Sequence, residues 1–219
     1  MRVTTYDSDF KSSQHINFYP YVGKDYWSSQ HKILVLGESH YGPQSKNSYH
    51  EWTRDVVEND FLENYDSGNS LPDWVACHRN TANVLARVRN ANPHEVYDDI
   101  AFYNFFQKSI GEEDHADKRY LTTELKKISA KALAEVMKIL QPDLIVGWGW
   151  SDLEWKYLPE SRNQVDINKD CAGIHLHLFY LNGFPNIPIW CMHHPSMGID
   201  IDAHRTCFAE IKKYLKWLG

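Results

Sequence analysis

Short apolar runs alternate with longer amphipathic stretches along most of the chain. The runs are rich in bulky and β-branched side chains, which is typical of strands buried inside a sheet. They cover residues 32–37, 100–105, 144–147, 174–181 and 187–192. Between residues 174 and 181 apolar and polar positions alternate, and Asn182–Gly183 then supplies a hairpin-turn sequence.

Helices are predicted in most of the intervals between these strands. Apolar side chains recur with a helical period in four stretches: two begin near Ser48 and at Pro72, and two carry the stripes from Leu125 to Leu140 and from Phe208 to Leu218. Pro72 suits a first helical turn, and a proline ends the third stretch. Residues 108–120 and 159–173 are polar and rich in turn-forming residues, so both are predicted to be loops.

Strands that alternate with long helices indicate an α/β protein. We expect a three-layer α/β/α sandwich with a mainly parallel four-stranded central sheet, to which the strand at 174–181 is an addition. The length of 219 residues fits a single domain. In it, residues 1–31 form a lead-in that packs on a core spanning residues 32–219.

The composition and charge of the chain limit the kinds of function that it could have. The formal net charge of -6 argues against a basic nucleic-acid-binding coat, although a local basic face is compatible with it. The four cysteines include no Cys-x-x-Cys pair, so we expect buried thiols, no iron–sulfur cluster and no other cofactor. The N-terminus lacks the apolar core of a signal peptide, and no run is long enough for a membrane span. These features predict a cytoplasmic protein without a membrane partner.

Polar side chains gather where the predicted strands end. Glu38, Ser39, His40 and Tyr41 follow the first strand directly. The other strand ends carry Asn104, then Gly147-Trp148-Gly149, then His193, His194 and Ser196. Because the carboxyl ends of parallel strands meet at one edge of a sheet, these side chains are expected to share a crevice.

The same residues resemble motifs of the uracil-DNA glycosylase superfamily. The matching segments are Gly37-Glu38-Ser39-His40-Tyr41, Phe102-Tyr103-Asn104, Leu144 to Gly149 and His194-Pro195-Ser196. Their order and strand placement match the superfamily over roughly residues 30 to 218. The resemblance implies a uracil-DNA glycosylase-like fold and an enzyme that flips a nucleotide out of DNA. That enzyme would hydrolyse the N-glycosidic bond of uracil or a modified pyrimidine, in base excision repair or in defence against phage DNA.

The resemblance also implies roles for individual residues. His194 would donate a hydrogen bond to the base oxygen as negative charge collects there. Asn104 would read the Watson–Crick edge of the base, and its amide matches uracil or, when flipped, a cytosine-like edge. Tyr41 and Gly37 would lie against the base, and Trp52 is a candidate for stacking on it.

The second motif and the residues around it would contact DNA. Ser196 and the backbone N–H groups after Pro195 would hold a phosphate, with His193 beside them. Met197 or Ile199 would fill the gap that the flipped nucleotide leaves, as apolar side chains do in other proteins that distort DNA.

Two positions depart from the superfamily pattern. Ser39 stands where the best-known branch has a water-activating aspartate. Glu38 or His40 could accept the proton instead, or departure of the base could leave an oxocarbenium-like sugar that needs little help from a base. His40 also replaces the proline of the first motif, which leaves the identity of the base open. The sequence supports no metal site at a recognised spacing, although His175 and His177 share one face of a predicted strand.

Two alternative functions remain. Gly37-Glu38-Ser39 resembles the nucleophile block of SGNH-type esterases, with Ser39 as the nucleophile. However, Asp202-Ala203-His204 lacks the Asp-x-x-His spacing of that class. The other alternative is a catalytically inactive nucleic-acid-binding module of the same fold, for which the serine at position 39 is the main argument.

Overall fold

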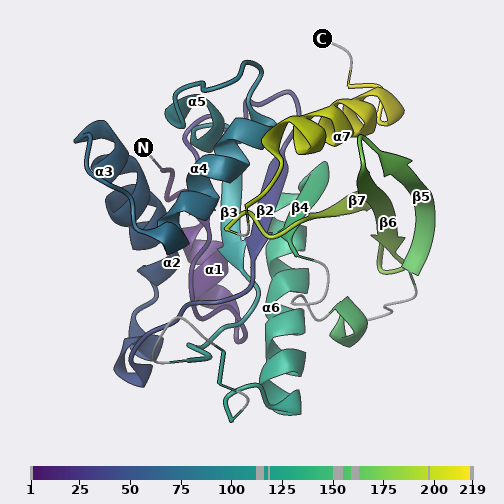
Figure 1. Ribbon diagram of the computed structural model, residues 1–219. Helices are drawn as coiled ribbons and strands as arrows, with labels where there is room; N and C mark the ends of the chain where they lie inside the picture. Colours follow the sequence, from purple (N-terminus) through teal and green to yellow (C-terminus); the bar gives the residue numbers. More distant parts are fainter. Residues whose placement is uncertain are drawn as a thin grey trace.

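A computed structural model provides the structure of the protein and describes residues 2–111, 116–117, 119–149, 155–158, 163–196 and 198–217. The chain forms an α/β protein around a seven-stranded mixed sheet with the strand order β1-β3-β2-β4-β7-β6-β5 (Figure 1). The strands are β1 (Tyr21–Val22), β2 (Ile33–Gly37), β3 (Ile100–Asn104), β4 (Leu144–Trp148), β5 (Asn163–Cys171), β6 (Ile174–Leu181) and β7 (Phe184–Met192).

The prediction of a mainly parallel four-stranded sheet is wrong. Only the pairings among β3, β2, β4 and β7 are parallel, whereas β1 pairs antiparallel with β3. Strands β6 and β5 then extend the sheet antiparallel from β7. The C-terminal half of the sheet is therefore mostly antiparallel.

Strand β5 was predicted as a loop because its sequence is polar. It lies at the edge of the sheet, where most of the side chains described for it are exposed, and of these only Ile167 and Cys171 pack toward the core. An edge strand needs no apolar run, because much of its surface faces water. The short strand β1 likewise lies inside the lead-in of residues 1–31, so that segment contributes to the sheet itself.

Helices cover both faces of the sheet (Figure 1). They are α1 (Asp7–Ser12), α2 (Trp52–Asp55), a π-helix (Val56–Glu63), α3 (Asn64–Asp66), α4 (Asp73–Leu85), α5 (His94–Tyr97), α6 (Thr123–Leu140) and α7 (Ile201–Tyr214). Short 3-10 turns lie at Gln44–Ser48 and Trp155–Tyr157. Within the described ranges, no helix is long and apolar enough to cross a membrane.

The alternation of side chains along β2 divides the core. Leu34 and Leu36 face the cluster formed with α1 and α6, whereas Ile33 and Val35 face the cluster formed with α4, α7 and the π-helix. Both clusters consist of fully or nearly fully buried side chains. Strands buried on two faces need the continuous apolar runs that the sequence shows.

Helix α4 ends at Leu85, where a side chain of α7 binds the carbonyl groups that follow its last turn. The Arg205 guanidinium donates to the backbone carbonyls of Asn83, Ala86 and Arg87. These carbonyls would otherwise lack partners at a helix C-terminus. A side chain distant in sequence therefore binds this end of the helix.

The segments that follow β2 and β3 run side by side beyond the sheet. Backbone N–H groups of Phe105 and Phe106 donate to the carbonyls of Gly37 and Glu38, each over 2.9 Å. Further along, the Gly42 N–H donates to the carbonyl of Gly111 over 2.7 Å. These hydrogen bonds hold residues 38–42 at the carboxyl edge of the parallel strands, where the polar side chains were predicted to meet.

Candidate functional site

A pocket of about 450 Å³ lies at the carboxyl edge of the parallel strands, within the size range of small-molecule sites. Strand ends, the turns after them and two helical segments form its wall. The lining residues are Glu38, Ser39, His40, Tyr41, Pro43, Lys46, Trp52, Val56, Asp60, Trp74, Cys77, His78, Phe102, Asn104, Trp148, His194 and Ser196. The predicted convergence of strand-end residues is thus found in one cavity.

His194 is oriented by Ser196, two residues later in the turn after β7. The Ser196 N–H donates to Nδ1 of His194 over 3.3 Å, and the Ser196 hydroxyl oxygen lies 2.7 Å from the same nitrogen. Because Nδ1 accepts, the proton of the neutral ring lies on Nε2. The turn itself is tied to α4, since the Asn80 side chain donates to the carbonyl of Pro195 over 2.7 Å.

Asn104 ends β3 and is almost completely buried beside Gly37 and His40. A Cβ atom at position 37 would lie 2.4 Å from Oδ1 of Asn104, so only glycine leaves room for this amide. The Asn104 amide nitrogen lies 3.2 Å from Nε2 of His40. The neighbouring ends of β2 and β3 therefore place the Asn104 amide in the pocket wall. Gly37 makes this possible because it has no side chain to occupy the same space.

His40 is a buried, neutral side chain held from several directions. Its Nε2 lies 2.8 Å from the hydroxyl oxygen of Thr53, and its ring stacks on Trp52 with 4.6 Å between centroids. Burial lowers the pKa of His40 to about 3, with smaller contributions from His78 and Lys46. A neutral, buried ring can hold Asn104 in place but is poorly suited to accept a proton near neutral pH. Trp52, the candidate for stacking on the base, is packed against His40 instead.

The pocket floor includes a second buried histidine on α4. The His78 ring lies between Phe102 and Trp148, with centroid separations of 4.7 and 4.9 Å. Its Nδ1 lies 2.8 Å from the hydroxyl oxygen of Tyr97. Burial lowers the pKa of His78 to about 3, so this lining residue is uncharged at neutral pH.

The first-motif side chains at the pocket rim are engaged in different ways. The Tyr41 hydroxyl donates to Oε2 of Glu38 over 2.6 Å. The Ser39 hydroxyl lies 3.0 Å from the carbonyl of His40 and 3.3 Å from that of Lys108, and it donates toward these acceptors. Within the part of the chain that the structure describes, no histidine ring is hydrogen-bonded to the Ser39 hydroxyl, as an esterase nucleophile would require.

Three of the predicted DNA-contacting residues lie away from the pocket lining or cannot be placed. His193 is exposed, and its ring packs against His204 at 5.1 Å between centroids. Ile199 is half-buried and packs against the core cluster beneath α7. Met197 lies outside the described residues.

The structure also brings residues to the pocket that the strand-end argument missed. Asp60 comes from the π-helix, and Trp74 and His78 come from α4. Burial and the nearby Asp55 raise the pKa of Asp60, with Lys46 opposing them. No described hydrogen bond or ion pair engages this carboxylate. The sequence carries a signal only for His78, which lies in the apolar stripe of the helix that begins at Pro72. Asp60 and Trp74 reach the pocket through contacts across the sheet edge, and such contacts leave no local pattern in the sequence.

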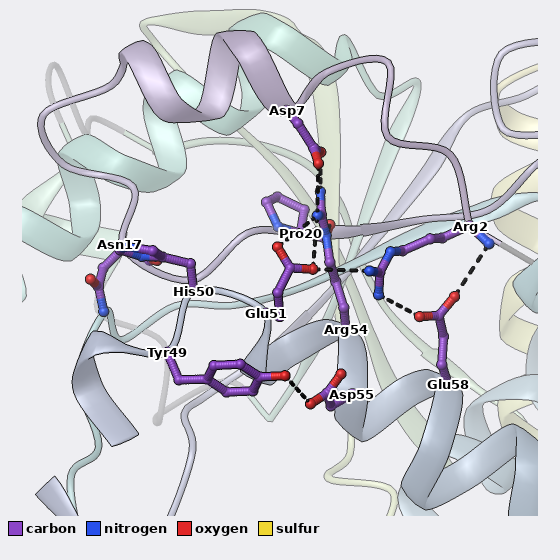
Figure 2. A network of polar contacts seen from close by, with 10 residues as sticks. All are labelled: Arg2, Asp7, Asn17, Pro20, Tyr49, His50, Glu51, Arg54, Asp55 and Glu58. Atoms are coloured by element: carbon purple, nitrogen blue, oxygen red, sulfur yellow. Dashed lines mark hydrogen bonds and ion pairs between the residues drawn. The ribbon is translucent and has the colours of Figure 1, made fainter. Parts of the chain in front are cut away.

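An ion-pair network around the buried Arg54 anchors α2, the helix that places Trp52 in the pocket wall (Figure 2). Arg54 is 1% exposed, pairs with Asp7 and Glu51, and donates from Nε to the carbonyl of Pro20 over 2.9 Å. Arg2 pairs with the same Glu51 at 3.0 Å. The network thus joins the N-terminal segment to α2, directly beside Thr53 and the π-helix.

The histidines considered as metal ligands do not form a complete site. The rings of His175 and His177 lie 6.1 Å apart on β6. Among the described residues, no group of three or more His, Cys, Asp or Glu side chains is placed to hold a metal ion.

Comparison with known proteins identifies no family for the chain, because no family model and no curated protein matches it.

Proposed function

We propose that the protein is a DNA glycosylase-like hydrolase, a divergent relative of the uracil-DNA glycosylase superfamily. The observation that carries the proposal is that Asn104 and His194, from separate motifs, line one pocket together with the aromatic side chains of Trp52, Phe102 and Trp148. The substrate is a nucleotide in DNA whose base, uracil or a modified pyrimidine, enters this pocket.

In the proposed reaction, Asn104 binds the base edge and His194 stabilises the leaving base. The glycosidic C–N bond breaks, and the base nitrogen keeps the electron pair. The resulting negative charge spreads to the base oxygen, toward which Nε2–H of His194 donates. The sugar develops oxocarbenium character, and water adds to C1′ to leave an abasic site.

The added water must lose a proton, and Ser39 is a poor acceptor near neutral pH. The described pocket lining offers two carboxylates, Glu38 and Asp60. Glu38 accepts a hydrogen bond from the Tyr41 hydroxyl. The raised pKa of Asp60 brings its carboxylate closer to the range that suits a general base, so we assign Asp60 this role.

The proposal is tested with DNA strands and duplexes that carry uracil, other damaged bases, or hydroxymethylated and glucosylated cytosines. Enzymatic activity is read as alkali-labile abasic sites. We expect His194→Ala to abolish cleavage while DNA affinity is kept. His175→Ala on β6 is the matched control, because it removes a histidine outside the described pocket lining.

Other outcomes would replace the proposal. DNA binding without cleavage of any substrate would identify a binding module. A protein that neither binds nor cleaves DNA, but forms an adduct between Ser39 and a fluorophosphonate probe, would be an esterase.

A further inference from the structure

The rim of the pocket carries an unusually exposed tryptophan. Trp74 lies in the first turn of α4 and is 49% exposed, although it also lines the pocket. Trp52 and Trp148 in the same lining are 7% and 5% exposed. The Trp74 ring makes no ring-to-ring contact with another described aromatic residue, which leaves about half of its surface open to solvent.

A second aromatic side chain lies at the same rim, on a different element. Tyr41 follows β2 and is 36% exposed, and its hydroxyl group donates to Glu38. The entrance to the pocket therefore presents aromatic surface from both α4 and the β2 turn. Aromatic side chains at a site entrance stack on nucleobases without regard to sequence, because every base has a π-face.

The position of Trp74 relative to His194 is constrained. Asn80, on the same helix as Trp74, donates to the carbonyl of Pro195 in the turn that holds His194. Helix α4 and this turn are therefore directly connected. A nucleotide whose base occupies the pocket would place its neighbour in the strand near the rim.

The charges of the pocket do not favour binding through phosphate groups. Among its described lining residues, Lys46 is the only lysine or arginine, whereas Glu38 and Asp60 are both acidic. Affinity that depended on phosphate contacts would need several cations. Stacking is the interaction that this rim is equipped to provide.

Of the two side chains predicted to act as a wedge in duplex DNA, Ile199 packs against the core, and Met197 lies outside the described residues. A base can stack on an exposed indole only when it is unpaired or displaced from its neighbour. We propose that Trp74 stacks on the nucleobase next to the one in the pocket, and that the preferred partner is single-stranded DNA. This inference rests on the proposed function.

The test compares two tryptophans of nearly equal exposure. Trp27 is 47% exposed, packs against Tyr6 and Tyr26, and is not among the described pocket-lining residues. The probe is a fluorescein-labelled thymidine oligonucleotide, and the dissociation constant is measured by anisotropy for the strand and for the matching duplex. Trp74→Ala should raise the dissociation constant for the strand by about 5- to 150-fold, the range expected for one stacked base. Trp27→Ala should leave it unchanged, and Trp74→Phe should restore part of the affinity.

The outcomes separate this inference from the proposed function. If Trp74→Ala binds the strand as the unmodified protein does, or if the duplex binds more tightly, the stacking role is overturned and the glycosylase proposal stands. If the unmodified protein binds neither strand nor duplex, both fail. Quenching of intrinsic fluorescence by an unlabelled oligonucleotide gives an independent readout, which should be lost in Trp74→Ala and kept in Trp27→Ala.

Discussion

The Ser196 backbone N–H donates to Nδ1 of His194 over 3.3 Å, and the Ser196 hydroxyl lies 2.7 Å from the same nitrogen. Two groups of one residue therefore hold the ring in the tautomer that carries its proton on Nε2. In the proposed reaction this is the proton that faces the developing charge, so Ser196 acts as a positioning residue.

Ser196→Ala should slow base release without abolishing it. The variant keeps the backbone hydrogen bond and loses the hydroxyl, whose contribution of about 0.5–1.5 kcal/mol corresponds to about a 2- to 12-fold lower single-turnover rate. Ser196→Thr, which retains a hydroxyl, should recover part of the rate. An alanine variant with an unchanged rate and pH profile would show that the hydroxyl does not position His194.

Asp60→Asn should lower the single-turnover rate by about 100- to 10,000-fold if Asp60 activates the water. The carboxylate is the active form, so the activity of the unmodified protein should fall as pH drops through the raised pKa of Asp60. This acidic limb should be absent from the residual activity of Asp60→Asn. Glu38→Gln tests the other carboxylate, and a larger loss there with the acidic limb removed would transfer the role to Glu38.

The same substitution should stabilise the folded protein at neutral pH. Folding raises the pKa of the Asp60 carboxyl group because its ionised form is poorly solvated in the folded protein. The free energy of unfolding therefore decreases as pH rises through the raised pKa. Asp60→Asn removes this cost, so its melting temperature should exceed that of the unmodified protein at pH 7. The difference should disappear below the pKa of an unfolded aspartate, about 3.9. A lower melting temperature at pH 7 would contradict the assigned environment.

Because of His40, the free energy of unfolding should decrease as the pH is lowered. Its pKa is about 3 in the folded protein and about 6.5 when unfolded, so only the unfolded state takes up a proton between these values. This contribution is fully present above pH 6.5 and is lost as pH falls, by up to about 1.4 kcal/mol per pH unit. Urea unfolding at a series of pH values should show a smaller slope for His40→Gln than for the unmodified protein. Equal slopes would mean that His40 is accessible to protons in the folded state.

Removal of Arg54 should destabilise the fold. Arg54→Ala leaves Asp7, Glu51 and the Pro20 carbonyl without their buried partner. Because the two carboxylates are partly exposed to water, the loss should be about 1–3 kcal/mol of unfolding free energy. Arg89→Ala is the matched control, because the Arg89–Asp202 pair is largely exposed and should contribute about 0–1 kcal/mol. Urea denaturation measures both, and similar losses in the two variants would remove the special role of the network in Figure 2.

The sequence by itself determined the elements whose local pattern is strong. The apolar runs that became β2, β3, β4 and β7 could be identified because strands buried on two faces require such runs. Their order, with polar residues directly after each run, was also sufficient to place Glu38, Asn104 and His194 at one edge. Parallel strands bring their carboxyl ends together whatever covers their faces.

Only the tertiary structure decided the features that depend on contacts between distant segments. Strand β5 is polar because it lies at an exposed edge, so its sequence resembles a loop. Asp60 and Trp74 reach the pocket because the π-helix and α4 pack across the strand ends, and contacts from distant segments, such as those of Arg54 and Arg205, hold these helices in place. Hydrophobic periodicity records which face of an element is buried, but it does not record which neighbouring element lies against that face.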